Sequence, residues 1–482
     1  MAANLPTRPP TTDDTGGVGG VVRSFGPLAV SNLVSQLVGF VVLIYVARRT
    51  GATNLGAFAF AFLLATYFNL FATLGIDYLA MRDVAQGRDS AGSIVGETLV
   101  LQSVLSVILY IGLVALAPQL ATNHEVERMI PIVGIILFTT TFTIDWVLLA
   151  LGRSRSVALW RLVGQVAYAA LVPLLVVGGR NGIFHYAWLS MLGLAVTAVG
   201  LMWVYLRDAT TRLHVSGTRA LLLRLHRSMP FAYSLVMVQI YASVGMLMLG
   251  YLYSTRAVGI YAVASKLPVA LVVFANLWLS VLFPHIARRL VADARGVAHD
   301  VGRIVTATIV IGVGATVGAL LCAGTLMTTL FGASFHAAAV PFALLSGWGA
   351  LVLVQANFST VLLAGGSQRY YAAVVTIAAA FVTLFGLVLI PPLGAIGAAL
   401  ATVCGEIGLT TLTLLGVCRR LGPLALDGYR LIRGAGAVGI MAVAMFGARS
   451  LGGAVVQIAV ALPTFVAAAW VLRVFDRDLI RL

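Results

Sequence analysis

The sequence has few charged residues: Asp, Glu, Lys and Arg make up 10% of its 482 residues, while 60% are hydrophobic. Soluble domains carry roughly 25% charged residues, so this composition is too apolar to cover a water-facing surface. The apolar residues occur in runs of about 20, the length that a helix needs to cross a hydrocarbon core of about 30 Å. The sequence therefore predicts an all-α polytopic membrane protein.

Cysteine and recognisable nucleotide-binding motifs are also scarce. The three cysteines, Cys322, Cys404 and Cys418, lie in or beside apolar runs and show neither a metal-binding spacing nor a disulfide framework. The sequence has no phosphate-binding P-loop and no dinucleotide glycine fingerprint. We therefore expect no metal, no cofactor and no ATPase activity within this chain.

The chain is strongly basic, with a formal net charge of +15, and Lys266 is the one lysine among its 31 basic residues. In a soluble protein such a charge would suggest nucleic-acid binding. Here the basic residues lie in short loops between apolar runs, where they set topology and contact anionic lipids. We therefore expect anionic lipids as partners and no nucleic acid.

The breaks between apolar runs predict fourteen membrane-spanning helices. Their approximate bounds are 26–47, 55–79, 94–117, 130–151, 158–178, 183–205, 230–252, 258–283, 303–323, 338–363, 370–390, 394–417, 432–449 and 451–472. If the N-terminus is cytoplasmic, the cytoplasmic side holds 24 of the 31 basic residues and the opposite side holds six. Because cytoplasmic loops carry an excess of basic residues, we expect an inner-membrane protein with both termini in the cytoplasm.

Two pairs of matching segments indicate an internal repeat. Residues 147–158 (VLLALGRSRSVA) and 361–372 (VLLAGGSQRYYA) are identical at seven of twelve positions, and 56–61 (GAFAFA) matches 259–264 (GIYAVA). Both pairs relate a span to the span six places later. Six is even, so two six-helix lobes would share one orientation, with an axis along the membrane normal and a cavity between them. Such parallel repeats favour an alternating-access transporter over a channel or a receptor.

The repeat divides the chain into five parts, and no loop is long enough for a folded domain outside the membrane. The predicted parts are a disordered cytoplasmic tail (1–25), an N-lobe (26–206), a basic linker with an interfacial helix (207–229), a C-lobe (230–418), and two further spans with a cytoplasmic C-terminus (419–482).

Charged residues inside the predicted spans are candidate functional residues. A charge within hydrocarbon costs several kcal/mol, so it normally faces a cavity or a partner. Asp145 and Glu406 are candidates for a protonatable ion-coupling site, and a structural pairing with an arginine or a helix end is the alternative. Lys266 lies deeper in predicted span eight, where it is a candidate for holding an anionic headgroup.

Further candidates lie near the ends of spans or carry no charge. Arg48 and Arg49 lie at the outer end of predicted span one, close enough to the interface to extend toward it or to pair there. Asn32, Gln36 and Gln239 are amides within predicted spans. Uncharged amides suit sugar hydroxyls, and they suit hydrogen bonds between helices equally well.

Four motifs, in order along the chain, resemble the Wzx-type polysaccharide flippases. Residues 46–61 (VARRTGATNLGAFAFA) are similar to the opening of that family, and 74–85 (LGIDYLAMRDVA) to the end of its second span. Residues 259–267 (GIYAVASKL) are similar to the start of its eighth span, and 391–399 (PPLGAIGAA) to the entry of its twelfth. The resemblance covers most of residues 26–418.

The resemblance implies the multidrug/oligosaccharidyl-lipid/polysaccharide exporter fold, and a flippase without enzyme activity. The implied substrate is an undecaprenyl-diphosphate-linked oligosaccharide, passed from the cytoplasmic to the outer leaflet. The diphosphate would need cations, for which Arg48, Arg49 and Lys266 are the matching residues. Spans thirteen and fourteen would hold the polyprenyl tail, and a polysaccharide polymerase and glycosyltransferases are candidate partners.

Two other functions remain open. A cation-coupled multidrug exporter would share the fold, although fourteen spans and the basic residues Arg48, Arg49 and Lys266 argue against cationic drugs. A membrane polysaccharide polymerase or ligase would need a sizeable outer loop with catalytic side chains, and the predicted outer loops are short.

Overall fold

The structure, a computed structural model, describes residues 18–87, 91–208, 213–215, 217–292, 294–450 and 453–474, which are mostly helical and contain no strand. Their elements are α1 (Val18–Thr73), α2 (Ile76–Ala85), α3 (Ala91–Leu120), α4 (His124–Gly134), α5 (Ile136–Thr141), α6 (Asp145–Ala150), α7 (Ser154–Leu175), α8 (Arg180–Asp208), α9 (Thr218–Leu252), α10 (Thr255–Ala292), α11 (Ala294–Phe331), the 3-10 helix η1 (Ala333–Ala338), α12 (Ala339–Ala364), α13 (Gln368–Leu393), α14 (Ala395–Leu421), α15 (Gly428–Ala448) and α16 (Ala454–Val471).

Every predicted span has a helical counterpart. In the described part of the chain, twelve helical segments are long and apolar enough to cross a membrane. One of them, Gly26–Thr73, covers two predicted spans, and the shorter apolar helix Val456–Val471 covers the fourteenth. The prediction of an all-α multi-pass membrane protein with about fourteen spans is therefore confirmed. Helix α1 begins at Val18, inside the predicted tail 1–25, and the rest of that tail lies outside the described residues.

Helix α1 contains two spans because its backbone changes direction at one glycine. Gly51 has φ 78° and ψ 173°, a conformation that breaks the helix and that residues with a Cβ rarely adopt. The helical hydrogen bonding resumes directly after it, so predicted spans one and two meet without a loop.

Predicted span 130–151 is three short helices rather than one. Helix α4 ends at Gly134, α5 covers Ile136–Thr141, and α6 begins at Asp145. The threonines of this stretch bond their hydroxyls to backbone carbonyls one turn earlier, for example Thr140 to Ile136 at 2.8 Å and Thr143 to Thr139 at 2.6 Å. Such bonds compete with the helical pattern and bend or interrupt it.

The internal repeat is visible as two turns with the same geometry. After α6, Gly152 has φ 75°, and the amide of Arg153 bonds to the carbonyl of Leu148 at 2.7 Å. After α12, Gly366 has φ 74°, and the amide of Ser367 bonds to Leu362 at 2.8 Å. This is the glycine-terminated helix end known as the Schellman motif. It occurs twice, 214 positions apart, at the offset that the sequence match predicts.

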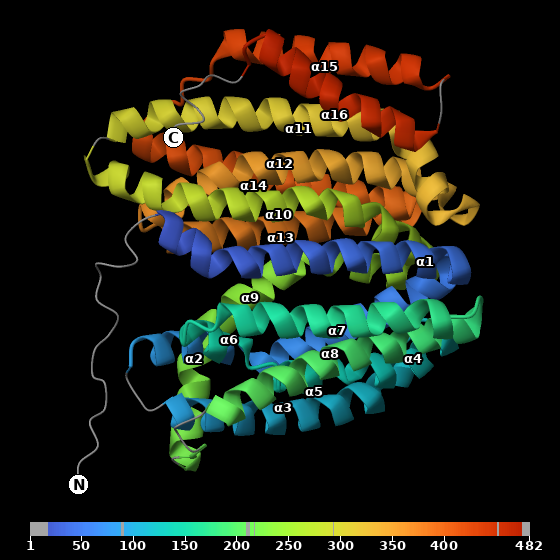
Figure 1. Ribbon diagram of the computed structural model, residues 1–482, viewed down its shortest axis with the longest axis vertical. Coiled ribbons are helices and arrows are strands. Elements are labelled where there is room, and N and C mark those ends of the chain that lie inside the picture. The colour runs from blue at the N-terminus through green and yellow to red at the C-terminus, as the bar shows by residue number, and fades with distance from the viewer. Residues whose placement is uncertain are drawn as a thin grey trace.

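The helices form two halves that share a core at one end only. Figure 1 shows α2–α8 on one side, α10–α14 on the other, and α1 and α9 between them. The largest hydrophobic cluster joins both halves and includes Val46, Leu55, Ile183, Val258 and Phe331. At the opposite end each half has its own cluster. One includes Ile94, Trp146, Val157 and Leu201, and the other includes Val301, Phe358, Leu362 and Val417.

The last two helices are added to the second half. Helix α15 packs against α16, and both contact α11 (Figure 1). The approach to α11 is close, because a Cβ on Gly434 would lie 2.3 Å from a methyl carbon of Val310. These helices therefore lie outside the repeated pair of six-helix halves, as predicted.

Helix α9 connects the two halves at the end where their cores are separate. Its first turns correspond to residues 218–229 of the predicted linker, and it continues without a break to Leu252. Arg224 is buried and donates to Glu97 Oε2 on α3 from Nε at 3.1 Å and from Nη2 at 2.9 Å. Its Nη1 lies 3.9 Å from Asp83 Oδ2 on α2. The start of α9 is thereby fixed to the first half.

We predict that Arg224→Met strongly destabilises the protein. Removing one partner of a buried ion pair leaves the other charge uncompensated, which costs about 3–5 kcal/mol. Thermal unfolding of the purified protein in detergent measures the effect, with Arg227→Met as the control because Arg227 is exposed on the same helix. Adding Glu97→Met to Arg224→Met should recover most of the loss. Equal unfolding temperatures for Arg224→Met and Arg227→Met would contradict this role.

Candidate functional site between the two halves

At the end with the shared core, α1 and α10 touch backbone to backbone. A Cβ on Gly56 would lie 1.8 Å from the carbonyl oxygen of Thr255, and a Cβ on Gly259 would lie 2.0 Å from that of Ala52. Both distances are impossible for real atoms, so only glycine allows this approach. Gly56 and Gly259 open the two repeated segments GAFAFA and GIYAVA. The repeat thus places its two equivalent glycines in contact with each other.

Four hydrogen bonds between the halves surround this contact. Asn123 Nδ2 donates to Thr255 Oγ1 at 2.7 Å, and the hydroxyl of Tyr251 donates to the carbonyl of Leu120 at 3.0 Å. Arg48 donates from Nε to the carbonyl of Leu330 at 2.7 Å, and its Nη2 donates to that of Thr329. We call this set of contacts, centred on Gly56 and Gly259, the glycine contact. By the charge distribution of the loops it lies at the predicted outer end.

Arg48 and Arg49 contact different parts of the protein. Arg48 satisfies the free carbonyls at the C-terminus of α11, where the helix dipole also favours a cation. The guanidinium of Arg49 stacks over the ring of Tyr45 at 5.5 Å on its own helix, and its carbonyl accepts from the amide of Gly179 at 3.1 Å. The first half alone therefore provides both partners of Arg49.

Lys266 lies on the face of α10 that makes the glycine contact. It follows Gly259 by seven residues, two helical turns, which places it on the same face and about 10 Å farther along the axis. Val263, between them, is buried, whereas Lys266 is exposed. No acidic side chain of the described residues pairs with its ammonium group. Lys266 is therefore an exposed cation on the face of α10 that meets the first half, without an acidic partner among the described residues.

A polar bridge between the halves includes the predicted candidate Gln239. Gln239 Nε2 donates to Ser243 Oγ at 2.9 Å on α9, and that oxygen lies 2.9 Å from the hydroxyl of Tyr67 on α1. Tyr67 and Ser243 are absent from the sequence-based candidates. The sequence could have identified Tyr67. It follows Gly56 by eleven residues, or three helical turns, and therefore lies on the same face of α1 as Gly56.

Glu406 is enclosed in the second half. It is 1% exposed, and its Oε2 accepts from the hydroxyl of Tyr241 on α9 and from Trp348 Nε1 on α12 at 3.2 Å. In the part of the chain that the structure describes, no basic side chain pairs with it. A carboxylate held only by neutral donors links α9, α12 and α14.

Asp145 has a different environment in the first half. Its Oδ2 accepts a hydrogen bond from Nη2 of Arg161. The other terminal nitrogen of Arg161, Nη1, donates to Asn32 Oδ1 at 3.3 Å. This is the ion pair that the sequence leaves open as the alternative to a coupling role. Gln36 lies one turn after Asn32 on α1, and both are exposed. Arg161 lies inside predicted span 158–178. This position within a span could have identified it from the sequence as a partner for a carboxylate within another span.

Comparisons with known proteins agree with this architecture. A family model described as "Polysaccharide biosynthesis protein" matches residues 21–290. The solved structure "Lipid II flippase MurJ, inward closed conformation" aligns with a TM-score of 0.76 at 14% identity, covering 94% of this chain and 99% of that chain. An inward-facing multidrug resistance MATE family transporter of the MOP superfamily aligns with a TM-score of 0.60 at 16% identity, covering 83% and 98%. No curated protein matches the sequence. The exporter fold implied by the sequence motifs is confirmed.

We predict that Gly56→Ala or Gly259→Ala forces α1 and α10 apart at the glycine contact. The added methyl meets backbone rather than a movable side chain, so overpacking should cost about 1–3 kcal/mol. The measurement is labelling of Val263→Cys by a membrane-impermeant maleimide in whole cells, in a background without Cys322, Cys404 and Cys418.

The matched control is Gly112→Ala, because a Cβ at Gly112 meets nothing within 4 Å. Labelling should rise with Gly56→Ala and Gly259→Ala and stay at the parent level with Gly112→Ala. Labelling that all three variants leave unchanged would show that the contact tolerates a side chain.

Proposed function

The chain belongs to the polysaccharide biosynthesis protein family, and from this premise we propose that it is a flippase for undecaprenyl-diphosphate-linked oligosaccharide. It would move this lipid from the cytoplasmic to the outer leaflet of the inner membrane by alternating access, with both termini in the cytoplasm. Two repeated halves that share a core at one end and have separate cores at the other support this mechanism.

The observation that carries the proposal is the unpaired cation Lys266. An ammonium group within a membrane is costly unless it has a partner, and the described residues provide none. A diphosphate is a partner of the right charge, and it binds cations through charge-assisted hydrogen bonds. We therefore assign the first contact with the diphosphate to Lys266.

The neighbouring polar groups would contact the sugars. Gln239 and Ser243 on α9, with Tyr67 on α1, offer amide and hydroxyl groups from both halves. Asn32 and Gln36 offer exposed amides on the first half. Such groups exchange hydrogen bonds with sugar hydroxyls without adding charge.

The glycine contact would be the outer gate of this transporter. In the closed state Arg48 holds α1 to the last turn of α11, which assigns this residue to the gate rather than to the diphosphate. Opening would break these contacts and leave α9 to connect the halves, because α9 is bonded to both. The diphosphate at Lys266 would then be accessible from the outer side.

A multidrug exporter is the competing function, because a MATE transporter has a similar fold. The unpaired charge of Lys266 favours the flippase, since a cation in the pathway repels cationic drugs and attracts an anionic headgroup.

We predict that Lys266→Ala slows flipping at least ten-fold. Hydrogen bonds to charged groups contribute about 1.5–3 kcal/mol, which corresponds to roughly ten- to hundred-fold in binding. The measurement is the leaflet accessibility of undecaprenyl-linked oligosaccharide in cells that are depleted of the protein and complemented with each variant.

Lys266→Arg should retain most of the rate because it keeps the charge, and Arg256→Ala is the control because Arg256 is exposed on the same helix. Substrate that reaches the outer leaflet normally without the protein, but is left unpolymerised there, would indicate a polymerase or ligase instead. Normal flipping by Lys266→Ala would remove Lys266 from the mechanism.

We further propose that a proton drives transport through Glu406. Protonation would remove its charge and change the hydrogen bonds to Tyr241 and Trp348, which join three helices of the second half. Asp145 is less suited to this role, because Arg161 compensates its charge.

We predict that Glu406→Gln keeps substrate binding but abolishes the dependence of transport on a pH gradient, whereas Asp145→Asn keeps that dependence. The assay is flipping by purified protein in vesicles with an imposed pH gradient. Unchanged pH dependence in both variants would remove proton coupling from the proposal. If Asp145→Asn alone abolished the pH dependence of transport, the coupling site would be Asp145 in the first half.

A further inference from the structure

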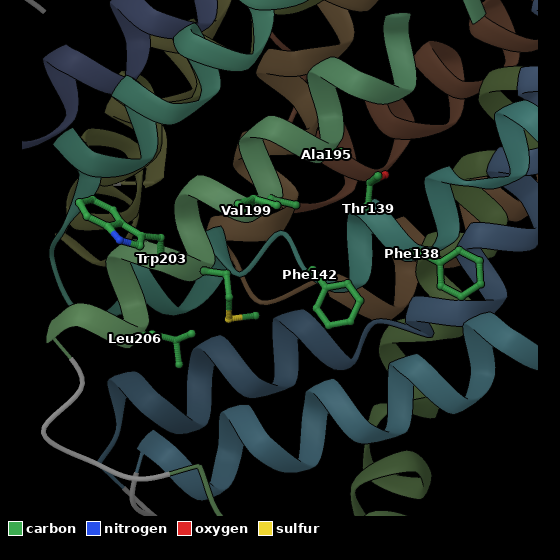
Figure 2. Close-up of a pocket in the computed structure, with 9 residues that line it drawn as sticks. Phe138, Thr139, Phe142, Ala195, Val199, Trp203 and Leu206 are labelled. Carbon is green, nitrogen blue, oxygen red and sulfur yellow. The ribbon is translucent and has the colours of Figure 1, made fainter. Parts of the chain in front are cut away.

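An apolar pocket of about 400 Å³ lies on the flank of the first half, next to α5 and α8. Figure 2 shows Phe138 and Phe142 on one side and Ala195, Val199, Trp203 and Leu206 of α8 on the other. Every residue that lines the pocket belongs to the first half, and Figure 1 shows α5 and α8 on the side of the molecule away from α10–α14. The pocket is therefore separate from the glycine contact and from the path between the halves.

The lining of the pocket suits a hydrocarbon chain. Thr139 is its one residue with a polar side chain other than Trp203, and the Thr139 hydroxyl already donates to the carbonyl of Ile136 at 3.1 Å. Val199 is 69% exposed and Trp203 is 52% exposed. Both belong to predicted span 183–205, so the pocket opens outward to the membrane.

The pocket covers only the part of α8 that crosses the inner leaflet. Helix α8 begins at the predicted outer side with Arg180 and ends where the basic linker 207–229 begins, on the predicted cytoplasmic side. From Ala195, near its middle, to Leu206 the helix rises about 16 Å, close to the depth of one leaflet of about 15 Å. The length of the pocket thus matches one acyl chain of the cytoplasmic leaflet.

One arginine lies at the cytoplasmic end of the pocket. Arg207 follows the lining residue Leu206 directly, and its guanidinium lies 5.3 Å from the ring centroid of Trp203, one turn earlier on α8. Such stacking is attractive and holds the cation next to the wall of the pocket. Arg207 is exposed, and no acidic side chain of the described residues pairs with it. An apolar pocket and a cation therefore lie side by side.

The tryptophan between the pocket and the arginine is supported from behind. The ring of Trp160 on α7 packs edge-on against Trp203, with 6.2 Å between the ring centroids. Trp160 fits there because residue 200 is a glycine, where a Cβ would lie 2.0 Å from the Trp160 ring. Tryptophans are common at the level of the headgroups. Trp203 is thus a fixed wall at the depth where a phospholipid changes from acyl chain to headgroup.

We infer that this flank binds one anionic phospholipid of the cytoplasmic leaflet. The phosphate binds at Arg207, and an acyl chain fills the pocket between Phe142 and Val199. A phosphodiester carries one negative charge, which matches a single arginine. The pocket ends near the middle of α8, which suits the acyl chain of a phospholipid better than the longer undecaprenyl chain. The lipid is a bound partner and not the transported molecule, so the inference does not depend on the proposed function.

The test is photo-cross-linking of the purified full chain in phosphatidylcholine nanodiscs. The probe is phosphatidylglycerol with a diazirine in one acyl chain, added at increasing mole fraction, and mass spectrometry locates the labelled residues. We expect labels on the lining residues of α5 and α8. Unlabelled phosphatidylglycerol should displace the probe, whereas zwitterionic phosphatidylethanolamine should not.

Arg207→Gln should raise the mole fraction for half-maximal labelling about five-fold, because one basic residue near the surface contributes about 1 kcal/mol. Arg433→Gln is the matched control and should leave this value unchanged. Arg433 belongs to the predicted cytoplasmic side, and its guanidinium lies 4.0 Å from the ring centroid of Tyr429, four residues earlier, as Arg207 stacks on Trp203.

A second variant tests the apolar pocket. Val199→Trp fills it and should remove the labels from Phe138 and Phe142, with an unchanged unfolding temperature because position 199 is exposed. Labelling that phosphatidylethanolamine displaces equally well would overturn the inference, because it indicates an ordinary boundary lipid. Equal losses in Arg207→Gln and Arg433→Gln would indicate unspecific attraction, and preferential displacement by undecaprenyl diphosphate would indicate an entry site for the substrate. Both would also overturn it.

Discussion

The backbone contact of α1 and α10 at Gly56 and Gly259 is the constraint on which the rest of the arrangement depends. Because neither position has a side chain, the two helices meet closely at the predicted outer end, and the large core that includes Leu55 and Val258 forms around them. At the other end the halves have separate cores, and α9 contacts both, the first half through Arg224 and the second through Tyr241. A transporter that alternates between two states needs such an asymmetry between its ends, and the proposed mechanism begins from it.

The placement of charge follows from the cost of burying it. Arg224 and Arg161 are neutralised by carboxylates, and Arg48 is satisfied by the end of α11. Lys266 lacks such a partner among the described residues, and the glycine contact two turns away fixes the direction in which it points. The proposed function assigns that missing partner to the substrate.

Apolar runs and the repeat were sufficient to predict the spans and the two halves, because hydrophobic length and topology depend on composition and local pattern. Local backbone events were not predictable in this way. The break at Gly51 joins two spans, and threonine hydroxyls divide span 130–151. Residue type identified Lys266, Glu406 and Asp145 as candidates, but their partners come from helices distant in sequence. The roles of Tyr67 and Arg161 therefore required the structure.

The most direct test of the central claim is the distance between spin labels at Thr53→Cys and Arg256→Cys, which are exposed positions of α1 and α10 beside the glycine contact. Double electron–electron resonance in lipid nanodiscs would compare the protein, in a background without its native cysteines, with and without undecaprenyl-diphosphate-linked oligosaccharide. The account predicts one short distance in the resting protein and a second, longer population with substrate. A single short distance that persists while the same labelled protein flips its substrate would contradict it.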